Sequence, residues 1–291
     1  MVIDQKWEHL KALLHEMKPA VLAYSGGVDS SLLLRAASEV MGQGLIAVTA
    51  VSETYPAGEL QSAEHFARSL GVTHRILHTH ELASEDFVKN SPDRCYFCKT
   101  ELFEKLRKIA DTEGISFVID GSNTDDLNDH RPGRRAAGEH SVRSPLVEAG
   151  LSKSEVRELA RGLELSVWDK PSLACLSSRI PYGTRITPAI LKAVQTAEDH
   201  LRAHGFRQVR VRHHGDLARI EVDPMDFAKL LSSNAAEQIT AALKEIGYTY
   251  VCLDLAGYRT GSMNEGMRKR HEGRETRDDG RVTKNLLRPS S

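Results

Sequence analysis

The sequence predicts an α/β protein with a doubly wound parallel sheet in its larger part and a smaller α+β domain after it. Two observations support this fold class. Short apolar segments alternate with stretches of helical periodicity up to about residue 170, which is typical of parallel sheets. Beyond residue 181 the pattern changes to alternating strands flanked by helices. We expect a first domain over 1–180, a second over 181–264 and a charged tail over 265–291.

The elements follow from the spacing of apolar residues. Four short apolar segments are expected to be buried strands, at residues 20–24, 45–51, 75–79 and 116–120. A helix near 152–163 precedes a predicted fifth strand at 165–168. In the second domain we expect helices near 188–204 and 225–245, and strands at 207–213, 217–222 and 248–254.

Composition excludes several protein classes. The 291 residues carry a net charge of −1, which gives no overall attraction to nucleic acid or anionic membranes. No apolar run approaches the ~20 residues that span a bilayer, and the N-terminus lacks a signal-peptide pattern. Four cysteines are too few for a disulfide scaffold in so long a chain. We therefore expect a cytoplasmic protein that has reduced thiols and no membrane partner.

A glycine-rich loop follows the first strand and opens a helix. Its residues are Ser25, Gly26, Gly27, Val28, Asp29 and Ser30. The glycines let the backbone wrap an anion, and the helix beginning near Asp29 points its N–H groups and positive dipole end at the same place. No Walker lysine follows. The loop predicts a phosphate cradle with Asp29 as a Mg²⁺ ligand, and a plain Gly-Gly turn is the alternative.

Three cysteines are candidates for metal or sulfur chemistry. Cys95 and Cys98 have the spacing of thiolate ligands, and Cys175 follows the predicted fifth strand. Three thiolates with an open fourth position suit a 4Fe-4S cluster better than zinc. Two alternatives stay open: a Cys-x-x-Cys pair without metal, and a buried structural Cys175. Beside Arg179, Cys175 is also a candidate nucleophile.

Other charged residues are candidates for ligand binding. Strand periodicity places Arg210 and Arg212 on one face, where paired guanidiniums suit phosphate or carboxylate; a solvent-facing strand is the alternative. Asp125 follows the fourth strand, where either Mg²⁺ binding or plain turn chemistry explains it.

Taken together, several separated segments resemble the LarE sulfur transferases of the ATP pyrophosphatase (PP-loop) superfamily. The resemblance covers residues 10 to 264. The segments that carry it are Ser25-Gly26-Gly27-Val28-Asp29-Ser30, Arg94-Cys95-Tyr96-Phe97-Cys98-Lys99, Gly121-Ser122-Asn123-Thr124-Asp125-Asp126, Arg131-Pro132-Gly133, Ser144-Pro145-Leu146, Ala174-Cys175-Leu176, Ser178-Arg179, Pro181-Tyr182-Gly183, Arg210-Val211-Arg212 and Ala218-Arg219-Ile220-Glu221.

The resemblance implies an adenine nucleotide alpha hydrolase-like fold and an enzyme that uses ATP with Mg²⁺ and forms AMP and pyrophosphate. Such an enzyme adenylates a carboxylate of pyridinium-3,5-biscarboxylic acid mononucleotide and converts it to a thiocarboxylate, in the synthesis of the nickel-pincer nucleotide cofactor. Members with one cysteine, at the position of Cys175, give up its sulfur and keep dehydroalanine. Members with three resemble enzymes that transfer sulfide bound to a 4Fe-4S cluster. We expect the cluster-bound version here, held by Cys95, Cys98 and Cys175.

The resemblance also implies roles for individual residues. Arg210 and Arg212 would hold the substrate phosphate, and Arg179 with Ser178 its carboxylate or the adenylate. Glu198 and Glu221 would belong to an acidic site near a subunit interface. The partners implied are a small-molecule nucleotide and further copies of the chain, commonly in a hexamer.

Three other functions share part of this pattern. A transfer-RNA thiolase of the cluster-dependent type uses the same loop and three cysteines, although the near-neutral charge argues against nucleic acid as a partner. An amide ligase resembling NAD synthetase shares the adenylation but has no use for the cysteines. A nucleotide-binding regulator would bind ATP without releasing pyrophosphate.

Overall fold

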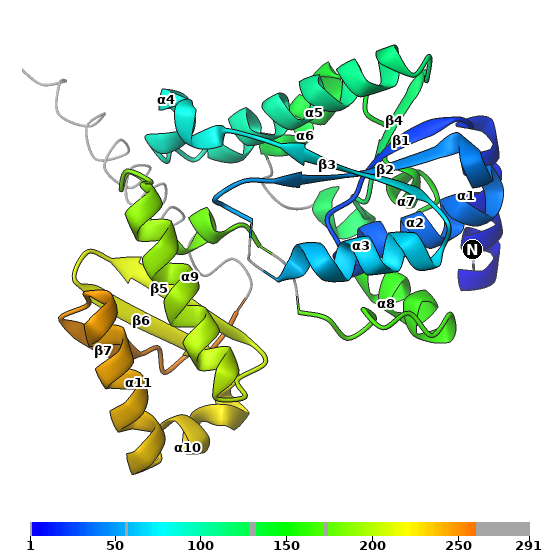
Figure 1. The fold of residues 1–291 in the computed structure, drawn as a ribbon. Helices are drawn as coiled ribbons and strands as arrows, with labels where there is room; N and C mark the ends of the chain where they lie inside the picture. Colours follow the sequence, from blue (N-terminus) through cyan, green and yellow to red (C-terminus); the bar gives the residue numbers. More distant parts are fainter. Residues whose placement is uncertain (1, 56–57, 128–131, 172–173, 260–291) are drawn as a thin grey trace, which may run out of the picture. The chain divides into compact units, whose positions relative to one another are not determined.

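The computed structural model describes residues 2–55, 58–127, 132–171 and 174–259 (Figure 1). The chain divides into two compact units, residues 1–196 and 197–291. We keep the domain boundary near residue 180 as a prediction, because the helix α9 (Pro188–Ala203) contributes residues to both units. The expected tail over 265–291 lies outside the described residues.

The first unit contains a four-stranded parallel sheet, as predicted. Its strands lie in the order β3-β2-β1-β4. They are β1 (Ala20–Ala23), β2 (Leu45–Val51), β3 (Thr73–His78) and β4 (Phe117–Asp120). Ala23 at the end of β1 pairs with both Val48 and Asp120, so the chain leaving β1 runs beside the chain leaving β4.

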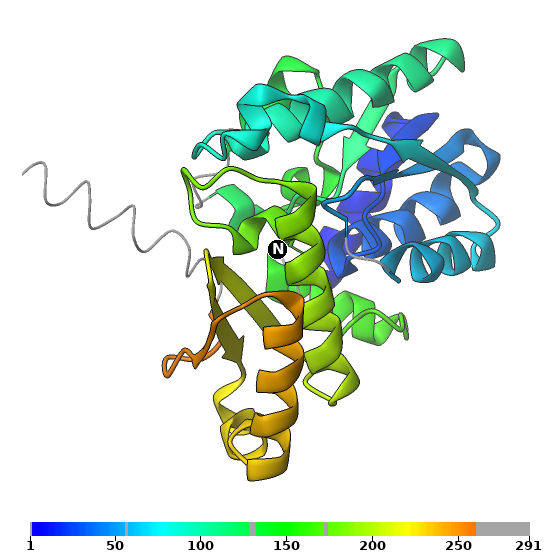
Figure 2. The same cartoon turned by 60° about the vertical axis from the view of Figure 1, so that its left-hand side comes forward.

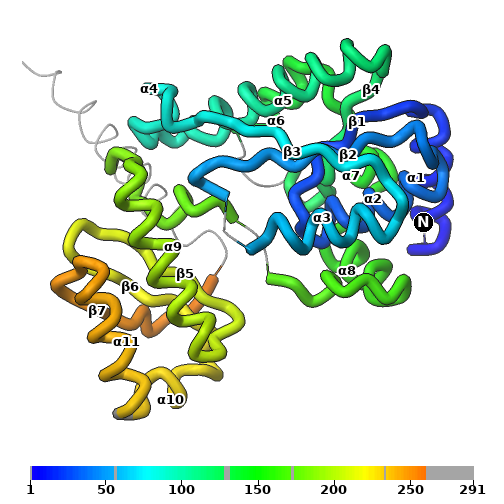
Figure 3. Tube along the Cα trace, in the orientation of Figure 1, coloured from blue at the N-terminus to red at the C-terminus, as the bar shows by residue number. Residues whose placement is uncertain are grey.

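Helices cover both faces of this sheet. The helices that precede α9 in this unit are α1 (Ile3–Glu16), α2 (Val28–Met41), α3 (Glu59–Ser69), α4 (Glu85–Val88), α5 (Arg94–Thr112), α6 (Pro132–Glu139), α7 (Pro145–Glu148) and α8 (Lys153–Gly162). Leu22 of β1 packs in one core with α1, α2, α3 and α8, whereas the neighbouring Val21 packs in another with α5. Figure 3 shows α5 and α6 on one side of the strands and α2, α3 and α8 on the other. The doubly wound arrangement is confirmed.

The predicted fifth strand is wrong. Residues 165–168 form a turn after α8, in which Leu165 N donates to Ala160 O (2.9 Å) and Trp168 N to Leu165 O (3.0 Å). Leu165 and Val167 are buried in the core shared by α2 and α8. These two apolar residues alternate with polar ones because they pack against α2 and α8. They are not part of a ladder of strand hydrogen bonds.

The second unit has a three-stranded sheet, β5-β6-β7, with β5 and β6 antiparallel and β6 and β7 parallel. The strands are β5 (Val209–His214), β6 (Leu217–Val222) and β7 (Tyr250–Leu253). The single helix expected near 225–245 is two helices, α10 (Phe227–Leu230) and α11 (Ser233–Ile246). Ser232, with the non-helical angles φ −58° and ψ 138°, interrupts the run and occupies the N-cap position of α11. Figure 2 shows α11 (orange) lying beside the strands.

Among the described residues, no helix has the length and apolar character needed to cross a membrane.

Candidate active site

The glycine-rich loop joins the end of β1 to the start of α2, and α2 begins at Val28 with Gly27 as its N-cap. Gly26 has φ +74°, and a Cβ there would lie 3.2 Å from the Ala63 Cβ of α3, so the position favours glycine. The Ser30 hydroxyl donates to Gly27 O (3.2 Å) and bonds the Ser25 hydroxyl (3.1 Å). The loop is therefore held in shape by its own serines, at the positive end of α2.

Gly121 brings the segment after β4 against this loop. A Cβ at Gly121 would lie 2.9 Å from both the backbone N and the Cα of Ser30. In the sequence, Gly121 belongs to a segment after the fourth strand that turn chemistry would also explain. The structure adds a steric reason, because only glycine permits so close an approach of two backbones.

Asp29, predicted to bind Mg²⁺, and Asp125, for which Mg²⁺ binding and turn chemistry were both left open, each contact Lys153. The Asp29 carboxylate forms an ion pair with the Lys153 ammonium and accepts from Asn123 Nδ2 (3.1 Å). The backbone N of Lys153 donates to Asp125 Oδ2 (3.3 Å). Lys153 was missed in the sequence, where only its position at the start of an expected helix marked it. The Mg²⁺ role of Asp29 stays a prediction.

A second lysine and a tyrosine contact the loop from other segments. Lys170 Nζ donates to Gly26 O (3.3 Å) and pairs with Glu59 of α3. The Tyr55 hydroxyl donates to Ser25 O (3.1 Å). Burial, with Glu59 and Tyr24 nearby, raises the pKa of Tyr55 well above its usual value, so this hydroxyl stays protonated as a donor. Lys153 and Lys170 thus place two ammonium groups near the loop, each paired with a carboxylate.

Cys95 and Cys98 lie in the first turns of α5, and Cys175 immediately precedes the 3-10 helix Leu176–Arg179. Cys95 is exposed, and the other two are partly buried. Burial raises the pKa of the Cys98 thiol, and the neighbouring Cys175, Glu81 and Cys95 raise it further. Cys175 and Cys95 therefore each lie near enough to Cys98 to affect its thiol.

These cysteines have the donor atoms that a 4Fe-4S cluster needs. In the described ranges, however, no three Cys, His, Asp or Glu side chains lie close enough together to hold a metal ion. The donor chemistry fits a cluster, whereas the described side-chain positions do not form a closed ligand set.

Glu81 is a site residue that the sequence did not reveal. Its carboxylate is 5% exposed, and its Oε1 accepts from Thr79 Oγ1 (3.0 Å) and from the Cys98 thiol (3.7 Å). Its Oε2 has no hydrogen-bond partner among the described residues. A buried acidic side chain thus borders the cysteine-bearing end of α5, and the surrounding polar sequence gave no signal of it.

Asn90 and Arg94 connect the segment after Cys175 to the start of α5, and we call them the Asn90–Arg94 clamp. Asn90 is fully buried with φ +55°. Arg94, which is 5% exposed, donates to Asn90 Oδ1 and to Ser177 O (2.9 Å). The Asn90 amide donates to three carbonyls, those of Ile180 (3.3 Å), Pro181 (2.8 Å) and Thr184 (2.9 Å). The clamp fixes the chain that follows Cys175 against the helix that carries Cys95 and Cys98.

Arg179 is 2% exposed and folds back on the chain around Cys175. Its Nη1 donates to Ala174 O (2.7 Å), Cys175 O (3.1 Å) and the Ser178 hydroxyl (3.0 Å). In these contacts Arg179 orders the Cys175 segment. The substrate roles of Ser178 and Arg179 stay predictions.

The remaining candidates lie in the second unit. Arg210 and Arg212 are each 5% exposed, so the alternative of a solvent-facing strand is wrong. Arg212 pairs with Glu221 (2.7 Å), and the guanidinium of Arg210 lies 5.2 Å from the centre of the Tyr258 ring. Glu198 is fully buried and accepts from Val211 N (3.1 Å). Arg212 and Glu221 thus form a buried ion pair, and the Glu198 carboxylate is buried against the backbone of the same strand as Arg212.

A parallel sheet with a glycine-rich loop between β1 and α2, and without a Walker lysine, defines the class of ATP-dependent PP-loop enzymes. The family model described as asparagine synthase matches residues 10–110. Within this class, the chain belongs to the LarE family.

Similarity to curated proteins extends over nearly the whole chain. The pyridinium-3,5-bisthiocarboxylic acid mononucleotide synthase of Lactiplantibacillus plantarum is 39% identical over 89% of this chain and 94% of its own length. An uncharacterised protein of Synechocystis is 42% identical over 92% of this chain and 100% of its own. Another uncharacterised protein, from Methanocaldococcus jannaschii, is 32% identical over 89% of this chain and 100% of its own length.

Proposed function

We propose that this protein is a sulfur transferase that forms AMP and pyrophosphate and converts a carboxylate of pyridinium-3,5-biscarboxylic acid mononucleotide to a thiocarboxylate. The name of the Lactiplantibacillus relative supports this substrate. One structural observation carries the proposal. Tyr55 O–H donates to Ser25 O (3.1 Å), and Leu176 N donates to Thr54 O (3.0 Å), so one turn bonds both the phosphate loop and the residue after Cys175.

The first step uses the loop of residues 25–30. A carboxylate oxygen of the substrate attacks the α-phosphorus of ATP, the bond to the bridging oxygen of the pyrophosphate breaks, and the products are an acyl-adenylate and pyrophosphate. The N-terminus of α2 binds phosphate oxygens. Lys153 and Lys170 stabilise the charge of the leaving pyrophosphate, and Asp29 is the residue that would hold Mg²⁺.

The second step delivers sulfur to the acyl carbon and releases AMP. We propose that Cys95, Cys98 and Cys175 are the residues that would hold a 4Fe-4S cluster, and such a cluster would supply sulfide for the transfer. The influence of both Cys175 and Cys95 on the Cys98 thiol supports this version. In the alternative, the Cys175 thiolate attacks the acyl carbon and displaces AMP. Loss of the Cα proton with cleavage of the Cβ–S bond then leaves the sulfur on the product and dehydroalanine in the chain. Arg179 orders the Cys175 segment in both versions.

Mass spectrometry of product and protein tests the proposal. Protein purified without oxygen is assayed for iron and acid-labile sulfide, then incubated with Mg²⁺, ATP and the biscarboxylated mononucleotide. We expect pyrophosphate release only with the mononucleotide, and a product in which sulfur replaces oxygen. Loss of H₂S at position 175 would establish the sacrificial version, and no release of pyrophosphate with the mononucleotide would refute the function. RNA binding that falls steeply with salt would favour a transfer-RNA thiolase.

Two further expectations rest on the family and remain proposals. We propose a homo-oligomer, which light scattering of the purified chain tests, and a cytoplasmic location. The expected acidic site near a subunit interface also stays a proposal. The ion pair of Glu221 with Arg212 lies within one chain.

A further inference from the structure

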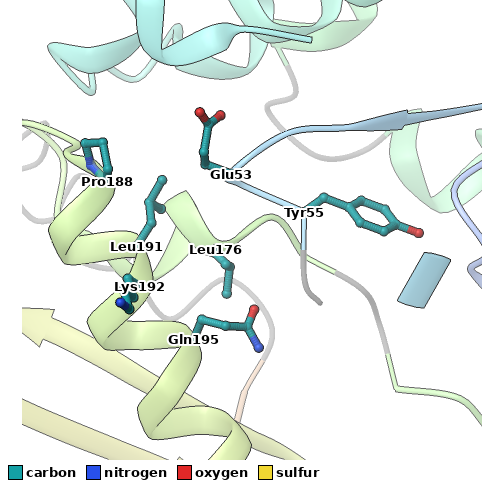
Figure 4. Close-up of a pocket in the computed structure, with 7 residues that line it drawn as sticks. All are labelled: Glu53, Tyr55, Leu176, Pro188, Leu191, Lys192 and Gln195. Carbon is teal, nitrogen blue, oxygen red and sulfur yellow. The ribbon is translucent and has the colours of Figure 1, made fainter. Parts of the chain in front are cut away.

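A small pocket lies between the turn after β2 and the first turns of α9, entirely within the first unit (Figure 4). Its volume is about 250 Å³. Leu176, Pro188 and Leu191 give it apolar walls, and Leu176 and Leu191 are buried. Glu53 and Lys192 line it as exposed side chains of opposite charge.

The pocket adjoins both reactive parts of the site through its own lining residues. Tyr55 lines it, and Figure 4 shows the Tyr55 ring directed away from α9. The hydroxyl at the end of that ring reaches the phosphate loop at Ser25 O (3.1 Å). Leu176 lines it as the residue next to Cys175, and its N–H is bonded to Thr54 O (3.0 Å). A ligand bound here is therefore close to residues of the adenylation site and to the sulfur-bearing segment.

The size and charge of the pocket select a kind of ligand. Pockets for drug-sized ligands measure roughly 300–1,000 Å³. The present pocket is smaller and suits a single planar ring, so the rest of a nucleotide would lie outside the pocket. The apolar walls contact the faces of a ring, the Glu53 carboxylate complements a cationic ring nitrogen, and the Lys192 ammonium complements a carboxylate on the ring.

We propose that this pocket binds the pyridinium ring of the acyl substrate and presents one ring carboxylate to the phosphate loop while Lys192 faces the other. This assignment rests on the proposed function, and it adds Glu53 and Lys192 as residues that determine substrate specificity. The adenine of ATP is also planar, but it carries neither a positive charge nor a carboxylate. An adenine pocket would therefore have no use for the opposite charges of Glu53 and Lys192.

Two substitutions separate these occupants. Glu53→Gln and Lys192→Met each remove one charge with little change of shape, and both side chains are exposed, so the fold is expected to persist. Lys108→Met, at an exposed position of α5, is the matched control for loss of an exposed lysine. The first readout is ATP–pyrophosphate exchange, with separate KM values for the biscarboxylated mononucleotide and for ATP. We expect each pocket variant to raise the KM of the mononucleotide about fivefold, as for an exposed charge contact, and to leave that of ATP unchanged.

The second readout is binding without catalysis. Nicotinic acid mononucleotide carries a pyridinium ring with one carboxylate, and we expect Glu53→Gln and Lys192→Met to weaken its calorimetric binding by a similar factor, whereas AMP binding stays the same. A raised KM for ATP with an unchanged KM for the mononucleotide would overturn the proposal in favour of adenine. Unchanged binding of nicotinic acid mononucleotide by both variants would overturn it as well. If the wild-type protein shows no exchange with the biscarboxylated mononucleotide, the proposed function fails, and the calorimetric comparison still decides what the pocket binds.

Discussion

Replacement of Asn90 tests whether the Asn90–Arg94 clamp holds the sulfur-bearing segment in place. In Asn90→Ala the carbonyls of Ile180, Pro181 and Thr184 lose their donor, and Arg94 loses an acceptor. A typical net hydrogen bond contributes ~1 kcal/mol, and one to a charged group contributes more. Alanine also tolerates φ +55° less well than asparagine does. We expect the free energy of unfolding of the first unit to fall by about 4 kcal/mol.

Urea unfolding of the full chain measures this loss, and the rate at which a maleimide labels Cys175 in the folded protein measures the position of its segment. Asn90→Asp keeps the acceptor for Arg94 and a residue that tolerates φ +55°, but it turns a carboxylate oxygen toward the three carbonyls, so we expect a loss of stability at least as large. Asn234→Ala, at an exposed position of α11, is the matched control. A loss below about 1 kcal/mol in Asn90→Ala, together with an unchanged labelling rate at Cys175, would refute the role of the clamp.

Three other predictions concern the phosphate loop and one ion pair. Lys153→Met removes a positive charge beside Asp29, and we expect pyrophosphate formation to slow by roughly a hundredfold; an unchanged rate would exclude Lys153 from the adenylation step. Gly121→Ala forces a Cβ to 2.9 Å from the Ser30 backbone, so thermal denaturation should show a lower Tm and no stabilisation by ATP; full stabilisation by ATP would contradict the close approach. Hydrogen bonds from Lys6 and Ser152 hold the pKa of Glu155 at about 2, below its unfolded value, so this pair stabilises the fold above the unfolded pKa and the contribution is lost as the pH falls toward 2. In Lys6→Met we expect the free energy of unfolding to fall less as the pH is lowered than it does in the wild-type protein. The same dependence on pH in both proteins would contradict the role of this pair.

The sequence predicted the β1–loop–α2 unit because its signals are local. An apolar strand, two glycines and an apolar helix follow each other without interruption between residues 20 and 41. The strands at 45–51 and 217–222 have the predicted bounds for the same reason. The turn at 165–168 was misread because Leu165 and Val167 alternate with polar residues just as a half-buried strand does.

The contacts that shape the candidate site are mostly long-range, and the sequence did not predict them. Lys153 reaches Asp29 across 124 positions, and Asn90 reaches Ile180 across 90. No local pattern marks Lys153 or Asn90, because each contacts its partner only after distant segments of the chain pack together. The burial of Arg210 and Arg212 was likewise hidden, because the carboxylate that pairs with Arg212 lies on another strand.

The transfer of one oxygen atom tests the adenylation most directly. The biscarboxylated mononucleotide, labelled with oxygen-18 in its carboxylates, is incubated with the protein, Mg²⁺ and ATP, and the AMP is analysed by mass spectrometry. If a substrate carboxylate attacks the α-phosphorus at the loop of residues 25–30, each AMP formed carries one labelled oxygen. Unlabelled AMP, or formation of ADP in its place, would contradict the proposed function.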